Sequence, residues 1–99
     1  MEQDYCCKKI RKRTPEEARR LCNRLSRIEG QVRGIRAMLE REAYCTDILT
    51  QAAAAAAALK SFERELLDEH LRTCVTDGIR SGDDAVIDEL IETLGKMMK

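Results

Sequence analysis

Two long segments of the chain repeat apolar residues at alternating spacings of three and four. The first segment runs through Leu21, Leu25, Ile28, Val32, Ile35 and Leu39, and the second through Ile48, Ala52, Ala55, Leu59, Phe62 and Leu66. This seven-residue repeat is typical of helices that pack nearly parallel to one another. The sequence therefore predicts an all-α fold, and 3% aromatic residues with few β-branched side chains argue against an all-β fold.

Capping residues predict the ends of the two long helices. Thr14-Pro15-Glu16-Glu17 combines a cap, a proline suited to the first helical turn and a glutamate that completes a capping box. A first helix is expected from about Pro15 to about Arg41. Thr46 is the expected cap of a second helix, which ends at Ser81-Gly82-Asp83 after about 35 residues, or roughly 50 Å.

The apolar pattern changes beyond Leu66. The spacing becomes four, through His70 and Cys74, before the second helix ends. A third helix of about a dozen residues, or roughly 18 Å, is expected after a cap at Asp83 or Asp84. Its apolar seam consists of Ile87, Ile91, Leu94 and Met98.

The third helix is too short to cover the two long helices. These helices form a hairpin, so each apolar stripe is expected to stay half exposed in one chain. We expect two hairpins to pair in an antiparallel four-helix bundle, which makes the chain a homo-oligomer. The run Ala52–Ala58 either supports close helix approach or is a low-complexity helical stretch.

Charge is unevenly distributed in this neutral chain. Residues 1–41 hold twelve Lys/Arg and six Asp/Glu, whereas residues 42–99 hold six and twelve. Residues 1–13 are expected to be a flexible basic arm in front of a helical domain at 14–99. The basic half favours a polyanionic partner, although a solvated helix face paired with acidic neighbours would give the same composition.

Neither a membrane span nor a secretory signal is indicated. No apolar run approaches the ~18 residues of a span, and no apolar stretch follows the charged N-terminus, so we expect a cytoplasmic protein. The chain has five cysteines, an odd number, and a reducing compartment argues against a disulfide framework.

Three potential metal ligands can meet only between two chains. His70 and Cys74 share one helix face, and on their own they would be ordinary core residues. Cys45 lies about 43 Å from Cys74 along a continuous helix. An antiparallel dimer brings Cys45 of one subunit to His70 and Cys74 of its partner. Two thiolates and one imidazole suit trigonal Cu(I), whereas Zn(II) favours a fourth ligand.

Four motifs follow one another along the chain: RLSRIEGQVRGI (24–35), YCTDILTQ (44–51), ELLDEHLRTCV (65–75) and IRSGD (79–83). In order and spacing they resemble the copper-sensitive operon repressor (CsoR) family, and the resemblance spans roughly residues 14–96. The resemblance implies an all-helical tetramer, a dimer of dimers, that represses transcription when metal-free. Cys45, His70 and Cys74 fall on the family's copper ligands. Tyr44 and Glu89 resemble residues that couple metal binding to DNA release.

Other branches of the family sense different signals. The persulfide branch has Cys where His70 stands, and the nickel and cobalt branch has extra His near the N-terminus and His where Cys74 stands. The formaldehyde branch keeps the positions of Cys45 and His70 but usually lacks the third cysteine. The complete triad in this chain therefore favours Cu(I).

The resemblance also implies binding to double-stranded operator DNA through basic residues. Arg24 matches a family position involved in operator binding, and a basic position expected on the second helix is Lys60 or Arg64. Further candidates for phosphate contacts are Lys8, Lys9, Arg11, Lys12, Arg13, Arg19, Arg20 and Arg33.

The leading hypothesis is thus a Cu(I)-responsive repressor that releases DNA when Cu(I) binds. One alternative keeps the family but makes the chain a sensor of formaldehyde or reactive sulfur through Cys45. Another is a copper-buffering helical bundle without DNA binding, against which the basic arm argues. An enzyme is not expected, because the sequence offers no nucleophile–base pair and no phosphate-binding loop.

Overall fold

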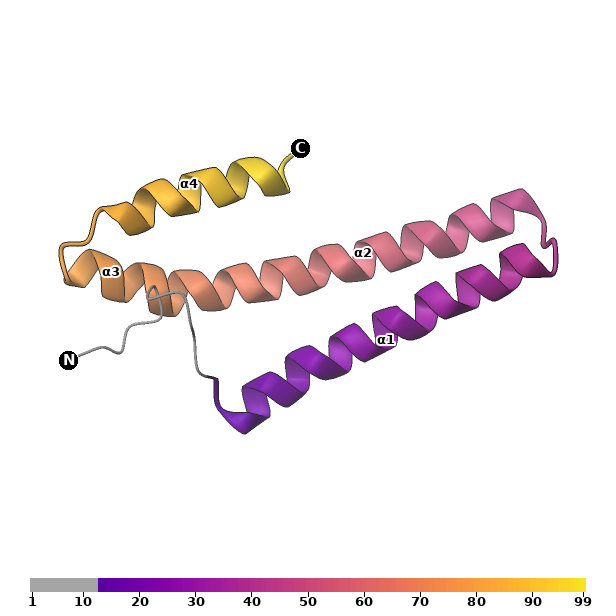
Figure 1. Ribbon diagram of the computed structural model, residues 1–99, viewed down its shortest axis with the longest axis horizontal. Coiled ribbons are helices and arrows are strands. Elements are labelled where there is room, and N and C mark those ends of the chain that lie inside the picture. Colours follow the sequence, from indigo (N-terminus) through magenta and orange to yellow (C-terminus); the bar gives the residue numbers. More distant parts are fainter. Residues whose placement is uncertain (1–12) are drawn as a thin grey trace. The chain divides into compact units, whose positions relative to one another are not determined.

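The computed structural model describes residues 13–99, which contain helices and no strand (Figure 1). In chain order these are α1 (Pro15–Glu40), α2 (Cys45–His70), a π-helical turn (Leu71–Val75), α3 (Thr76–Arg80) and α4 (Ala85–Met97). The all-α prediction is confirmed. The described residues form two compact units, the hairpin unit (Arg13–Glu65) and the C-terminal unit (Leu66–Lys99). No helix within residues 13–99 is long and apolar enough to cross a membrane.

The first helix begins as its capping residues predict. The Thr14 hydroxyl accepts a hydrogen bond from the Glu17 N–H at 3.1 Å, and the Glu17 carboxylate accepts one from the Thr14 N–H at 3.0 Å. Pro15 occupies the first turn, where its missing N–H leaves no bond unmade. This capping box satisfies two backbone donors and fixes the start of α1.

The chain turns after α1 on a glutamate in a position where glycine is common. Glu42 has φ +59°, in the left-handed region. The Ala43 N–H donates to the Met38 carbonyl at 2.9 Å, and the Glu42 N–H donates to the Leu39 carbonyl at 3.1 Å. These two bonds form a Schellman motif, which ends α1 although a side chain at this φ costs roughly 1–2 kcal/mol.

The second helix begins one residue before the predicted cap. The Tyr44 carbonyl accepts hydrogen bonds from the N–H groups of Asp47 and Ile48 at 3.0 and 3.2 Å, so Cys45 is already helical. The prediction that Thr46 caps α2 is therefore wrong. Thr46 lies within the first turn, and its carbonyl accepts a bond from the Thr50 hydroxyl at 2.8 Å.

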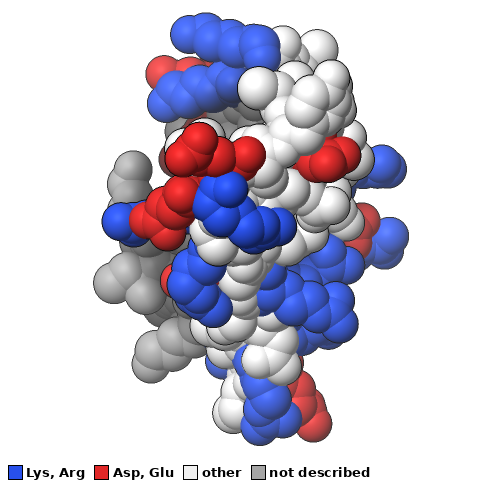
Figure 2. Space-filling view, turned by 90° about the vertical axis from the view of Figure 1, so that its right-hand side faces the viewer, with Lys and Arg blue, Asp and Glu red and all other residues white. Residues whose placement is uncertain are grey.

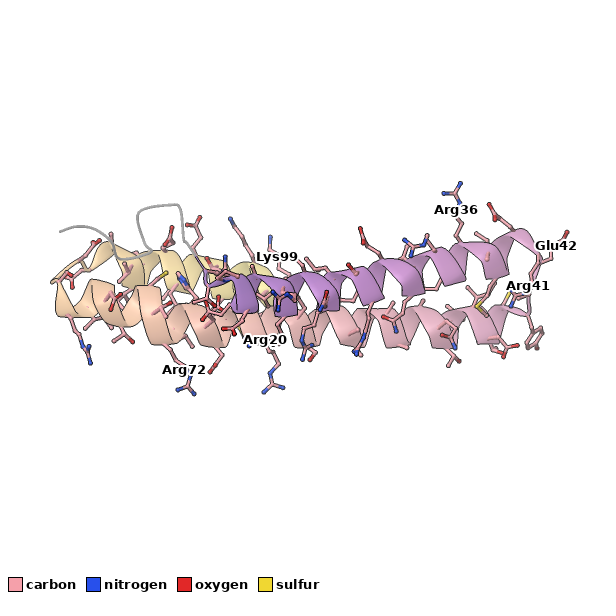
Figure 3. The ribbon with its side chains drawn as sticks, turned by 90° about the horizontal axis from the view of Figure 1, so that it is seen from below. Arg20, Arg36, Arg41, Glu42, Arg72 and Lys99 are labelled. Carbon is pink, nitrogen blue, oxygen red and sulfur yellow. The ribbon has the colours of Figure 1, made fainter. Side chains whose placement is uncertain are left out.

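In the hairpin unit, α1 and the first part of α2 run antiparallel (Figures 1 and 3). One residue of each predicted seam is buried, Leu21 of α1 and Ala55 of α2. Other seam residues stay open to solvent, since Val32 is 54% exposed and Leu39 66%. The prediction that one hairpin leaves its apolar stripes half exposed is confirmed for these described residues.

The C-terminal unit contains a wider helical turn that interrupts the predicted second helix. Residues 71–75 are π-helical, so helical residues 45–80 form α2, the turn and α3 rather than one uniform α-helix. On an α-helix, each side chain four residues further along is rotated by about 40° around the helix axis relative to the one before. A π-helical turn holds more residues per turn, so it removes part of this rotation. The change of seam spacing beyond Leu66 is the sequence signal of this turn.

The connection between α3 and α4 follows the predicted pattern. Gly82 has φ +78°, and the Asp83 N–H donates to the Gly78 carbonyl at 2.8 Å. The Asp83 carboxylate accepts a hydrogen bond from the Ala85 N–H at 3.1 Å, whereas Asp84 at the cap position makes no capping bond with its side chain. Of the two predicted caps, Asp83 is thus the one that supplies a side-chain oxygen.

The buried face of α4 contains only part of its predicted seam. Val86 is 3% exposed, whereas the seam residues Ile91 and Met98 are 63% and 82% exposed. Val86 is buried because it packs against Gly78 of α3. Of the predicted seam, Ile87 and Leu94 are half-buried, whereas Ile91 and Met98 stay exposed within the described chain.

Gly78 is required by the close approach of α3 and α4. A Cβ at this position would lie 2.6 Å from Val86 Cγ1. Gly78→Ala should lower the free energy of unfolding by about 1–3 kcal/mol, because the contact would be overpacked. Gly95→Ala in α4 is the matched control, since its added Cβ meets no atom within 4 Å, and it should raise stability by up to about 1 kcal/mol. Chemical unfolding followed by circular dichroism measures both variants, and equal stability changes would contradict the packing explanation.

Candidate metal centre and nucleic-acid interface

The three predicted metal ligands lie in two separate places along the helices. Cys45 is the exposed first residue of α2, whereas His70 is the half-buried last residue. Cys74 follows in the π-helical turn and is 2% exposed. His70 and Cys74 are neighbours on successive turns. Cys45 and His70 are roughly 38 Å apart along the helix axis of α2.

One chain does not assemble this site from its described residues. Within residues 13–99, no group of three His, Cys, Asp or Glu side chains is placed to hold a metal ion. Cys22 and Cys45 are free and exposed. In contrast to the reduced thiols expected from the sequence, Cys74 is disulfide-bonded. A metal requires the thiolate of Cys74, so metal binding has to be measured on the reduced protein.

Tyr44 and Glu89, which the resemblance relates to metal-dependent DNA release, lie on different elements. Tyr44 immediately precedes α2, and its side chain is 72% exposed. Glu89 lies on α4 and is also exposed. Their proposed roles depend on a metal-bound assembly, so they stay predictions.

Arg24 extends from α1 to α2, where it is held by two side chains. Its Nε lies 2.7 Å from Oε1 of Glu65, and its Nη1 donates to the Ser61 hydroxyl at 3.2 Å. Arg20, one turn earlier, donates from Nε to Oε2 of Glu65 at 2.7 Å. The Glu65 carboxylate therefore binds two arginines that are candidates for DNA contacts.

The other predicted DNA-binding residues are spread over the described chain. Arg19, Arg33 and Arg64 are exposed, Arg13 is half-buried, and Lys60 lies 3.6 Å from a Glu63 carboxylate oxygen. Figure 2 shows basic side chains beside acidic ones on the face that it draws. Four further candidates, Lys8, Lys9, Arg11 and Lys12, lie outside the described residues.

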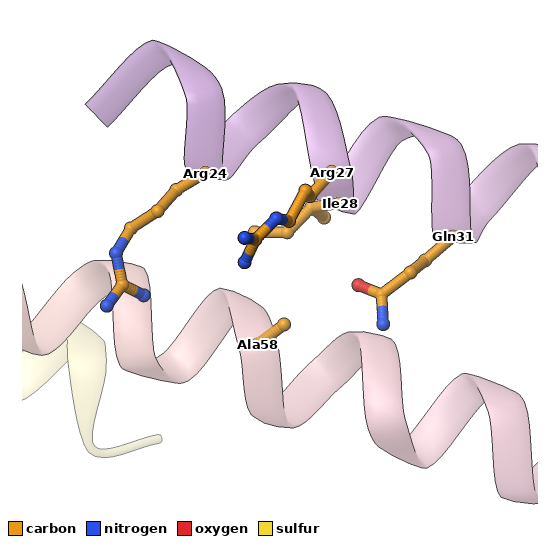
Figure 4. A pocket seen from close by; sticks show the side chains of 5 residues that line it. All are labelled: Arg24, Arg27, Ile28, Gln31 and Ala58. Carbon is orange, nitrogen blue, oxygen red and sulfur yellow. The ribbon is translucent and has the colours of Figure 1, made fainter. Parts of the chain in front are cut away.

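A hollow of about 270 Å³ lies beside Arg24, between α1 and α2 (Figure 4). It is lined by Arg24, Arg27, Ile28 and Gln31 of α1 and by Ala58 of α2. Arg27 and Gln31 are not among the residues predicted from the sequence to bind DNA, although Arg24, Arg27 and Gln31 recur at spacings of three and four. Their guanidinium and amide groups suit an anionic oxygen such as that of a phosphate. By contrast, Arg36 points away from α2 (Figure 3).

The fold and these motifs are those of a family of transcriptional regulators. Residues 17–96 match the family model of the metal-sensitive transcriptional repressor, so the chain belongs to this family. The copper-sensing transcriptional repressor CsoR of Bacillus subtilis (strain 168) is 43% identical over 100 residues, which cover 100% of this chain and 99% of the relative. The copper-sensing transcriptional repressor RicR of Mycobacterium tuberculosis (strain ATCC 25618 / H37Rv) is 49% identical over 69 residues, covering 70% of this chain and 72% of the relative.

Solved structures give the same classification. The copper-sensing repressor CsoR with Cu(I) from Geobacillus thermodenitrificans NG80-2 has a TM-score of 0.86 and 42% identity, over 89% of this chain and 93% of that chain. The nickel-responsive transcriptional regulator InrS has a TM-score of 0.70 and 38% identity, over 79% and 89%. The predicted family and fold are confirmed. The prediction that the chain is not an enzyme is confirmed as well, since the family consists of transcriptional repressors.

Proposed function

We propose that this chain is a Cu(I)-responsive repressor that binds operator DNA when metal-free and releases it when Cu(I) binds. The observation that carries the proposal is the ligand set Cys45, His70 and Cys74, placed near opposite ends of α2. Antiparallel pairing of two chains would join Cys45 of one subunit to His70 and Cys74 of the partner subunit. The copper-sensing relatives support this reading.

The donor atoms of this set favour Cu(I) over other metals. Two reduced thiolates and one imidazole are soft ligands, and three ligands satisfy trigonal Cu(I). Structural Zn(II) sites have a fourth protein ligand, which this set does not supply. The structural likeness to a nickel-responsive regulator makes Ni(II) the necessary comparison. His70 is the chain's single histidine, so imidazole-rich coordination of Ni(II) is not available from one site.

We further propose that the functional assembly is a homotetramer built as a dimer of dimers. The exposed seam residues of α1 and α4, such as Val32, Leu39 and Ile91, support burial by other copies. In this assembly the basic residues of α1 and those within residues 1–13 contact DNA phosphates. The basic halves of four chains would bring a net charge of roughly +24 to one DNA-binding particle.

Arg24 offers a direct test of the DNA-binding surface. Arg24→Ala should weaken DNA binding while leaving Cu(I) affinity unchanged, because Arg24 lies on α1 and outside the ligand set. The slope of log K against log salt should flatten by about 0.9 for each phosphate that the variant no longer neutralises. Arg36→Ala is the matched control, since Arg36 of the same helix pairs with Glu40 at 3.4 Å and points away from α2. Fluorescence anisotropy at several salt concentrations measures both, and an equal decrease in both variants would argue against a specific role of Arg24.

A second candidate function rests on the free, exposed thiol of Cys45. A thiol in this environment can also react with formaldehyde or with persulfide sulfur, which would make the chain a thiol-based sensor. The experiment that separates the candidates starts from reduced protein bound to DNA selected by the metal-free protein. Cu(I), Ni(II), formaldehyde and a persulfide are then titrated separately without oxygen. We expect release by Cu(I) at one equivalent per subunit. If only another agent releases the DNA, the chain is a sensor of that agent and not of Cu(I). If the protein binds copper but selects no DNA, it is a copper buffer.

A further inference from the structure

Glu65 of α2 contacts two arginines of α1, Arg20 and Arg24. Its side chain is 23% exposed, whereas those of Arg20 and Arg24 are 57% and 39% exposed. Each carboxylate oxygen lies 2.7 Å from the Nε of a different arginine. Both oxygens are thus occupied by short, charge-assisted contacts. All three residues belong to the hairpin unit.

This carboxylate binds the two guanidinium groups that would otherwise be available to a phosphate. The guanidinium fork recognises carboxylate and phosphate with the same donors. Arg20 and Arg24 lie one turn apart, about 6 Å along α1. Arg20, Arg24 and Glu65 together carry one net positive charge, whereas the two arginines alone would carry two. A DNA phosphate that approaches this pair must displace the carboxylate or bind in spite of its charge.

We propose that Glu65 is an internal phosphate mimic of the DNA interface, which competes with DNA phosphates for Arg20 and Arg24 and so weakens binding to DNA of arbitrary sequence. This inference rests on the proposed DNA contacts of Arg20 and Arg24. Binding without sequence preference depends almost wholly on phosphate contacts, so an internal competitor weakens it directly. Operator binding adds base contacts and DNA shape, which offset the competition.

The test is binding of reduced, metal-free, full-length protein to a fluorescein-labelled 30-base-pair duplex of random sequence. Glu65→Gln should bind this duplex about 3- to 10-fold more tightly, with a salt slope steeper by about 1 or more, because two guanidinium groups become available to phosphates. Glu29→Gln at an exposed position of α1 removes the same charge and is the matched control. Glu65→Asp keeps the charge but shortens the side chain, so it cannot reach both arginines equally well, and it should give an intermediate effect.

The outcomes are distinct. Tighter binding by Glu65→Gln than by Glu29→Gln supports the inference. Equal effects of these two variants would mean that Glu65 acts only through the net charge of the protein, and this result would overturn the inference. Weaker binding by Glu65→Gln also overturns it, since Glu65 would then position the arginines for DNA. Helical circular dichroism and Cu(I) stoichiometry show whether each variant is folded. If the wild-type protein binds neither this duplex nor any selected DNA, the proposed function itself fails.

Discussion

Cys45→Ala or Cys74→Ala should remove tight Cu(I) binding from the reduced protein. A trigonal site without one of its two thiolates keeps two ligands, so the decrease in affinity should exceed the roughly 100-fold that a residue outside the ligand set can cost. Competition with a colorimetric Cu(I) chelator measures the affinity. X-ray absorption of the wild-type protein should show two sulfurs and one nitrogen around each copper.

The control for this decrease is another free and exposed cysteine. Cys22 lies on α1 and is not part of the ligand set, so Cys22→Ala should bind Cu(I) as the wild type does. A variant that lacks Cys45, His70 and Cys74 together should bind copper only weakly. Undiminished affinity in this triple variant would place the site elsewhere, with Cys6 and Cys7, outside the described residues, as the next candidates.

Copper binding should lower the affinity for DNA, and DNA binding should lower the affinity for copper. His70 should couple the copper site to the DNA-binding surface. Ligation would draw together Cys45 of one subunit and the helix end that carries His70 and Cys74 of the partner subunit. The second ring nitrogen of His70 could then form a hydrogen bond to Tyr44 or Glu89 and shift the adjoining helices. Replacing His70 by an N-methylated histidine that still offers the metal-binding nitrogen should leave copper affinity nearly unchanged but prevent DNA release.

The measurement is a pair of titrations on both proteins. The Cu(I) affinity is determined with and without DNA, and the DNA affinity with and without Cu(I). Linkage requires that the two ratios are equal, because both express one coupling free energy. We expect a coupling of about 1–3 kcal/mol in the wild-type protein and almost none in the methylated one. Normal release by the methylated protein would show that the hydrogen bond of His70 does not connect the sites.

The sequence predicts the helices well because their signals are local. The seven-residue repeat, the Thr14–Glu17 capping box and Gly82 all act within a few residues, and the structure contains each of them. The sequence predicts the position of the break between the two long helices, because the first helix is expected to end near Arg41, and the structure ends α1 at Glu40. It does not predict the left-handed conformation of Glu42, because the turn forms through backbone hydrogen bonds and no glycine marks it. The π-helical turn has a sequence signal in the changed seam spacing, but spacing alone does not specify the wider hydrogen-bond pattern.

The candidate site is only partly readable from the sequence. Cys45, His70 and Cys74 can be selected by residue type and by the resemblance, and the length of the second helix indicates that they need two chains. The contacts of Glu65 with Arg20 and Arg24 could not be predicted, because these arginines lie 45 and 41 positions before Glu65 in the sequence and pair with it only when the hairpin fixes its register. The same holds for the hollow beside Arg27, which depends on the small side chain of Ala58 facing α1.

Each copper site should be completed by two chains, and this can be tested by mixing two variants that each lack one thiolate. One variant carries Cys45→Ala, and the other carries Cys74→Ala. In a mixed dimer, one site lacks both thiolates, but the other combines the intact Cys45 of the second variant with the intact His70 and Cys74 of the first. Variants with different affinity tags are produced together, and the reduced assemblies that carry both tags, which contain mixed dimers, are isolated. We predict that they recover tight Cu(I) binding at one copper per dimer, whereas neither variant alone binds tightly. Mixed dimers that bind no better than the separate variants would contradict a site shared between subunits.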